Sequence, residues 1–176
     1  RAAEQCGAKD FKPPQLNIAD KCFDLKPPSV LIHAGCTNRT YWERRKWNHY
    51  EELADLLLKD GFHVYCCGSA DERANHPEVE AYTNLPIQET AALIQQCDLF
   101  LSNDSGLMHL AAALRKKQIA IFTATSDKKS GPYYNPRARV VRPALACYPC
   151  YGKEQAWNEC THWQCRDSIT MPAVHD

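Results

Sequence analysis

The chain has 176 residues, which suits a single domain with a short appendage. Basic residues (Lys plus Arg) and acidic residues (Asp plus Glu) both number 21, so the formal net charge is zero and no basic excess indicates nucleic-acid binding. Hydrophobic residues make up 44%, as in an ordinary globular domain, but no apolar run approaches the roughly 20 residues that span a membrane, and no signal-peptide pattern opens the chain.

Residues 1–28 show no sustained periodicity and contain two Pro pairs, which exclude a helix interior and a central strand. We interpret this segment as a linker or as the remnant of an N-terminal domain, and the first residue is Arg rather than Met. The predicted domain then covers residues 29–176 and includes a Cys-rich tail at residues 147–165.

A buried strand is predicted at Ser29–Ala34, followed by a polar loop and an amphipathic helix over about Trp47–Asp60. The loop contains Thr37, and Arg44 and Arg45 lie just before the helix. Hydroxyls, backbone N–H groups and guanidinium groups that follow the carboxyl end of a strand are suited to a diphosphate. A solvated basic loop is the alternative interpretation.

A second strand is predicted at Phe62–Cys67, and Glu72 follows it after a short turn. A carboxylate at this edge of a sheet can accept hydrogen bonds from both ribose hydroxyls of a nucleotide. Alternatively, Glu72 is only an acidic residue in the first turn of a short helix. A short strand at Val79–Tyr82 and a helix from about Leu85 to Cys97 are expected next.

Residues 97–125 predict strand, turn, helix and strand in succession. Apolar runs at Asp98–Ser102 and Ile119–Phe122 flank a helix that begins near Leu107. Such a βαβ unit implies a parallel sheet, so the predicted fold class is α/β, with a Rossmann-like parallel sheet flanked by helices. A last strand is expected at Ala138–Arg142, and a closing helix over residues 167–176.

The turn within this unit carries the candidate chemistry. Asp104, Ser105 and Gly106 lie between the carboxyl end of a strand and the amino end of a helix, where open α/β sheets bind ligands and free N–H groups favour phosphates. His109 is four residues after Ser105 and therefore lies one turn further along the same helix face. The alternative is an ordinary N-cap, with His109 as a half-buried helix residue.

Ten cysteines are a high count for this length. Six are scattered and suit small buried side chains in a reduced, cytoplasmic protein. The other four can supply thiolates to structural zinc or iron, although the spacing of the second pair is irregular for a zinc knuckle. Two disulfides, or reduced thiols packed under a loop, are the alternatives. The four clustered cysteines to which these interpretations apply are Cys147, Cys150, Cys160 and Cys165.

Several of these segments together resemble one family. SNDSGLMHLAAAL, residues 102–114, is similar to the (N/D)D(S/T)G-x-x-H-x-A-A-A signature of the heptosyltransferases, glycosyltransferases that build the lipopolysaccharide inner core. HAGCT followed by Arg45-Lys46-Trp47 resembles the family's strand, hydroxyl loop and (K/R)-x-W, and GSADE resembles its G-x-x-x-E. The chain departs from the family's F-G-P-T, because Thr123 and Ala124 replace Gly and Pro before Thr125.

The resemblance implies the C-terminal half of a GT-B glycosyltransferase, which binds the nucleotide-sugar donor. The family transfers heptose from ADP-heptose with inversion and needs no cofactor for catalysis. The acceptor here would be the lipopolysaccharide core or a protein. By resemblance, the donor would be held at the diphosphate, sugar and ribose by Thr37, Arg45 or its rival Arg44, Glu72, Asp104, Ser105, Gly106, His109 and Thr125. Many members also end in a similar C-x-P-C…C…C pattern, and in autotransporter-type heptosyltransferases four such cysteines hold iron.

In this family the acceptor site and the catalytic base lie in an N-terminal domain, so no catalytic residue is assigned here. We expect the chain to bind donor but to transfer nothing without an N-terminal acceptor domain or a partner subunit, in the cytoplasm, either free or peripheral to the inner membrane. The alternative is a non-catalytic nucleotide- or metal-binding module. An NAD-dependent role is disfavoured because no GxGxxG follows the first strand.

Overall fold

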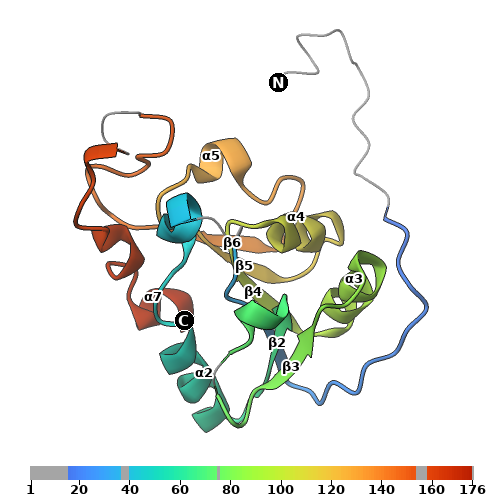
Figure 1. Cartoon of the computed structure of the whole chain (residues 1–176). Helices are drawn as coiled ribbons and strands as arrows, with labels where there is room; N and C mark the ends of the chain where they lie inside the picture. Colours follow the sequence, from blue (N-terminus) through green and yellow to red (C-terminus); the bar gives the residue numbers. More distant parts are fainter. Residues whose placement is uncertain (1–15, 37–39, 75, 154–157, 176) are drawn as a thin grey trace, which may run out of the picture.

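A computed structural model describes residues 16–36, 40–74, 76–153 and 158–175. Its centre is a six-stranded sheet in the order β3-β2-β1-β4-β5-β6, in which every neighbouring pair is parallel (Figure 1). This architecture confirms the predicted Rossmann-like α/β fold. The strands are β1 (Ser29–His33), β2 (His63–Gly68), β3 (Glu80–Thr83), β4 (Leu99–Asn103), β5 (Gln118–Ile121) and β6 (Ala138–Val141).

Helices cover both faces of the sheet (Figure 1). On one face, α2 packs with α7 over inward-facing residues such as Val30 and Ile32, and on the other, α3 and α4 pack over residues such as Leu31 and Phe100. Side chains alternate between the two faces because successive strand residues point to opposite sides. The helices are η1 (Thr40–Arg45), α2 (Tyr50–Lys59), η2 (Ala70–Glu72), α3 (Ile87–Gln96), α4 (Gly106–Ala113), α5 (Asp127–Ser130), η3 (Gln164–Arg166) and α7 (Met171–His175).

Two predicted helices are shorter than the sequence indicated. The first begins at Tyr50 instead of Trp47, and the backbone N–H of Trp47, which lies before the helix, donates to the side chain of Asn103. The closing helix begins at Met171, since Pro172 has no N–H with which to continue a helix that starts at residue 167. Gly61, with φ of +85°, follows α2 in the left-handed conformation that commonly ends helices.

The segment before the sheet contains no helix or strand over residues 16–28. Residues 1–15 of the predicted linker lie outside the described residues, and the domain boundary at residue 29 stays a prediction. Within the described part of the chain, no helix is both long enough and apolar enough to cross a membrane.

Candidate functional site

The candidate site lies at the carboxyl edge of the sheet, where the strand order reverses between β1 and β4. Open α/β sheets bind ligands in the crevice that forms at such a reversal. The strand ends bring together four side chains from segments far apart in the sequence: His33 at the end of β1, Glu72 after β2, Asp104 after β4 and Thr125 after β5.

Asp104 is a buried anion with several partners. Its side chain is only 3% exposed, and its Oδ2 lies 2.8 Å from Nη2 of Arg45, which also donates to the backbone carbonyl of Asp104. The hydroxyl of Thr125 donates to the same Oδ2 at 2.6 Å, and that of Ser130 does so at 3.4 Å. A buried carboxylate requires such compensation, so these contacts fix Arg45 and Asp104 relative to one another.

Ser105, His33 and Glu72 form a polar row beside this cluster. The hydroxyl of Ser105 is the N-cap of α4, accepting from the N–H of Met108 at 3.4 Å, and it lies 3.1 Å from Nδ1 of His33. On the other side of the imidazole, Nε2 lies 3.6 Å from Oε2 of Glu72, which also accepts the N–H of Ser69 at 2.8 Å. The row therefore links the ends of β4, β1 and β2.

The contacts of Glu72 lower its pKa to about 2. The contact with His33 is the largest cause, and the hydrogen bond from the N–H of Ser69 adds to it, while burial acts in the opposite direction. The carboxylate reaches this place because Gly35 has no side chain, since a Cβ there would lie 1.9 Å from Oε1 of Glu72. Glu72 is therefore ionised at neutral pH and held against the end of β1.

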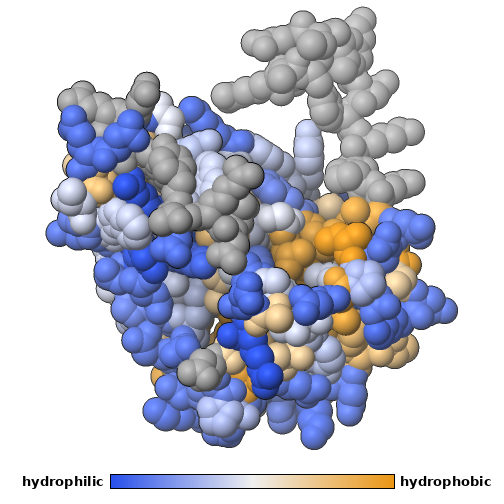
Figure 2. Space-filling model, in the orientation of Figure 1, coloured by the Kyte–Doolittle hydropathy of each residue, from blue (hydrophilic) through white to orange (hydrophobic). Residues whose placement is uncertain are grey.

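A cavity of about 340 Å³ opens beside this row. Its lining includes the polar side chains of His33 and Glu72 and the apolar side chains of Leu85, Ile87 and Leu107. Figure 2 shows apolar side chains gathered on the surface over α3 and α4. The amino end of α4 is open, because a Cβ added to Gly106 would have no neighbour within 4 Å.

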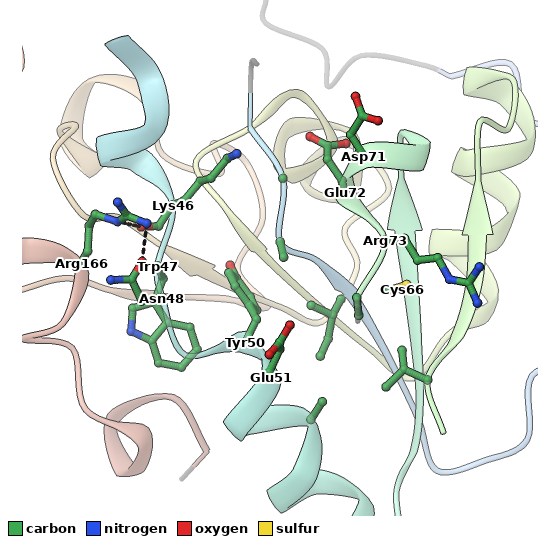
Figure 3. Close-up of a pocket in the computed structure, with 16 residues that line it drawn as sticks. Lys46, Trp47, Asn48, Tyr50, Glu51, Cys66, Asp71, Glu72, Arg73 and Arg166 are labelled. Carbon is green, nitrogen blue, oxygen red and sulfur yellow. Dashed lines mark hydrogen bonds between the residues drawn. The ribbon is translucent and has the colours of Figure 1, made fainter. Parts of the chain in front are cut away.

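A second hollow, of about 260 Å³, lies between α2 and η2 (Figure 3). Lys46 extends toward the side of the opening where Asp71 and Glu72 lie, and Trp47 and Tyr50 line the opposite wall. Glu72 lines both this hollow and the cavity beside α4, so it forms the boundary between them.

The two adjacent arginines point to different parts of the molecule. Arg45 contacts Asp104, and its guanidinium lies 5.1 Å from the ring centre of Trp42. Arg44 instead donates to the carbonyl of Cys160 at 3.3 Å and lies 5.1 Å from the ring centre of Trp163, both in the tail. Among the other predicted donor residues, His109 is exposed on α4, and Thr37 lies outside the described residues.

The four tail cysteines line one cavity of about 240 Å³, together with Glu159 and His162. The pKa of Cys165 is raised to about 11, first by burial and then by the neighbouring thiols of Cys150, Cys160 and Cys147. As the side chains are placed, no three His, Cys, Asp or Glu residues of the described ranges are arranged to hold a metal ion. All nine cysteines in these ranges are free thiols.

Three residues of this edge were not among the predicted site residues. His33 and Asn103 end β1 and β4 and stand within the two motifs quoted above, so their positions were a usable signal. Ser130 ends the short helix α5, for which the sequence shows no clear pattern, and its approach to Asp104 could not be anticipated.

Comparison with known proteins matches residues 3–161 to the model of glycosyltransferase family 9 (heptosyltransferase). Lipopolysaccharide heptosyltransferase 2 of Escherichia coli K12 is 31% identical over 151 residues, which are 73% of this chain and 43% of the relative. The corresponding enzyme of Salmonella typhimurium is 29% identical over 150 residues, with the same coverage. The chain thus spans less than half the length of these curated relatives.

Solved structures share the fold. E. coli ADP-heptose lipopolysaccharide heptosyltransferase II superposes with a TM-score of 0.57 at 25% identity, over 81% of this chain and 45% of that one. The dodecameric, iron-containing heptosyltransferase TibC superposes with a TM-score of 0.70 at 20% identity, over 93% of this chain and 47% of that one. The family match covers most of the sequence and agrees with the parallel sheet, so the chain belongs to glycosyltransferase family 9, the heptosyltransferases.

Proposed function

We propose that this chain is the donor-binding part of an inverting glycosyltransferase. It would bind ADP-heptose, or a related nucleotide sugar, for transfer to a lipopolysaccharide-core or protein acceptor. The observation that carries the proposal is the meeting of three groups at one sheet edge: the Arg45 guanidinium, the open amino end of α4 and the ionised Glu72. A relative with the same fold is described as acting on ADP-heptose.

The nucleoside fits the cavity beside α4. A flat base would lie between Leu85 and Leu107, because such sites are mostly apolar with a few placed polar groups. The ribose would then meet Glu72, which also lines the cavity. A carboxylate with a pKa of about 2 is fully ionised at neutral pH and can accept hydrogen bonds from both ribose hydroxyls.

The diphosphate would lie between Arg45 and the amino end of α4, whose first N–H groups favour an anion. Within the described residues, Nε of Arg45 is buried and has no hydrogen-bond partner. An unpaired donor of this kind is costly, and a phosphate oxygen is a suitable partner for it. As the acceptor hydroxyl attacks and the diphosphate leaves, these donors would stabilise the negative charge that grows on the leaving group.

We infer that transfer needs more than the groups present at this edge. In the proposed displacement a base removes the proton of the acceptor hydroxyl, and a surface must hold the acceptor opposite the leaving diphosphate. We assign neither role to a residue of this chain, and we propose that an N-terminal acceptor domain or a partner subunit supplies both. The chain alone would bind donor and transfer nothing.

Calorimetric titration of the chain with ADP, UDP, GDP and NAD tests the donor proposal. ADP should bind preferentially. The analogue 2′-deoxy-ADP should bind about tenfold more weakly, since it lacks one of the two ribose hydroxyls from which Glu72 would accept a hydrogen bond. Glu72→Gln should reduce this difference. Equal binding of all nucleotides would contradict the proposal and favour a non-catalytic nucleotide-binding module.

We also propose that the four tail cysteines hold a structural zinc or iron ion. The supporting observation is that all four line one cavity, and four thiol donors suit either metal once they are deprotonated. Their side chains would have to turn toward a common centre to reach it. The ion would fasten the tail, and the free thiols elsewhere in the described chain suit the reducing cytoplasm.

A further inference from the structure

We propose that Asn103 is a positioning residue for donor binding. Its amide holds both ends of the loop between β1 and α2, and thereby holds Arg45 against the diphosphate site. This inference rests on the proposed function, because it assigns Asn103 a role in binding the same nucleotide. Asn103 itself is not placed in contact with the ligand.

The hydrogen bonds of Asn103 reach three backbone groups. Its Oδ1 accepts the N–H of Trp47 at 3.0 Å, just before α2 begins. Its Nδ2 donates to the carbonyl of Ala34 at 2.7 Å and more weakly to that of Gly35 at 3.4 Å, just after β1 ends. One side chain therefore ties the two ends of the loop to the end of β4.

Only an amide can make this set of contacts. It presents an acceptor to the N–H at one end of the loop and donors to the carbonyls at the other. Asn103 is completely buried, so these groups have no water to replace a lost partner. An Asp at this position could accept from Trp47 but would place an oxygen against the carbonyls of Ala34 and Gly35.

The hydrogen bonds of Asn103 act on Arg45 through residues that are close to it in the chain or paired with it. Arg45 is two residues before Trp47, and Asp104, its ion-pair partner, directly follows Asn103. With Ala34, Gly35 and Trp47 held in this way, Arg45 approaches Asp104 in one geometry, and binding a diphosphate need not reposition it. Pre-organisation of this kind raises affinity by removing an entropic cost from the binding step.

Calorimetric titration of the Asn103→Asp and Asn103→Ser variants with ADP tests whether Asn103 positions the donor site. Both variants should raise the Kd for ADP about tenfold, because each loses part of a buried hydrogen-bond set. Ser102→Ala is the matched control, since Ser102 is the preceding residue of β4, is equally buried and has an Oγ without a partner in the described structure. The Kd of the Ser102→Ala variant for ADP should equal that of the parent.

A double-mutant cycle separates positioning from a general loss of stability. If Asn103 acts through Arg45, Asn103→Asp should have almost no further effect on the Kd once Arg45→Met is present. A full tenfold effect in that background would overturn the inference. So would an unchanged Kd in the Asn103 variants, provided that the parent chain binds ADP. A folded parent that binds no ADP would refute the proposed function and, with it, the role given to Asn103.

Discussion

Glu72 shows how a single residue at the strand ends depends on its neighbours. Its pKa falls from an ordinary 4.5 to about 2 in the folded chain, so the folded state favours the ionised form. The resulting stabilisation is fully present above about pH 4.5 and is lost as the pH falls toward 2. Acid therefore removes the stabilisation that the folded state gains from the contacts of ionised Glu72 between the ends of β1 and β2.

We expect Glu72→Gln to lower the free energy of unfolding at pH 7 by on the order of 1 kcal/mol. The difference from the parent should shrink as the pH is lowered from 5 to 2.5, because protonation removes the same charge from the parent. Urea unfolding across this range measures it, with the exposed Glu78→Gln as control. A difference that is equal at both ends of the range would show that the charge of Glu72 contributes nothing.

At this scale, the sequence predicted candidate site residues where they belong to a local pattern. Asp104 and Ser105 stand between a strand and a helix that hydrophobic periodicity locates, whereas Arg45, with Arg44 as its rival, was predicted only from the resemblance to the family motif. Their partners could not be predicted in the same way, because the contacts join distant parts of the chain. Asn103 and Ala34, for example, are 69 residues apart, and only the pairing of β1 with β4 makes them neighbours.

At the scale of elements, the strands could be predicted to within about one residue. The central strands are short apolar runs, as expected of strands in a parallel sheet with helices on both faces, whereas the edge strand β3 is more polar and partly exposed. The short helices η1 and α5 were not predicted, since neither carries a periodic apolar face. The position of η1 depends instead on tertiary contacts, including the hydrogen bond of Arg44 to Cys160 and the tilted ring contact of Trp42 with Tyr151.

The Cys-rich tail lies against the element that carries both arginines, so its integrity bears on the site. If the four cysteines hold a metal, the purified chain should contain about one equivalent of zinc or iron, and Cys165→Ser should lose most of it. Elemental analysis by mass spectrometry measures this. Cys22→Ser is the control, because Cys22 is exposed and lies outside the tail. Parent protein with less than a tenth of an equivalent would contradict the proposal.

For the whole molecule, the sheet order explains where the site forms. Neighbouring strands β1 and β4 are followed by helices on opposite faces, and the crevice between them receives Arg45, Ser105 and Glu72 from separate connections. The chain nevertheless spans less than half the length of its curated relatives. We therefore expect donor binding to be measurable on this chain, and sugar transfer only with acceptor-binding parts added.

The central claim is that a nucleoside diphosphate binds at this edge of the sheet through Arg45. Calorimetric titration of ADP into three proteins tests it most directly: the parent, Arg45→Met and Arg44→Met. The two variants each remove one guanidinium from adjacent positions, but only Arg45 contacts Asp104 at the strand ends. Arg45→Met should raise the Kd at least about tenfold, and Arg44→Met should change it by less than about threefold. Equal losses in the two variants, or no loss in Arg45→Met, would contradict this account.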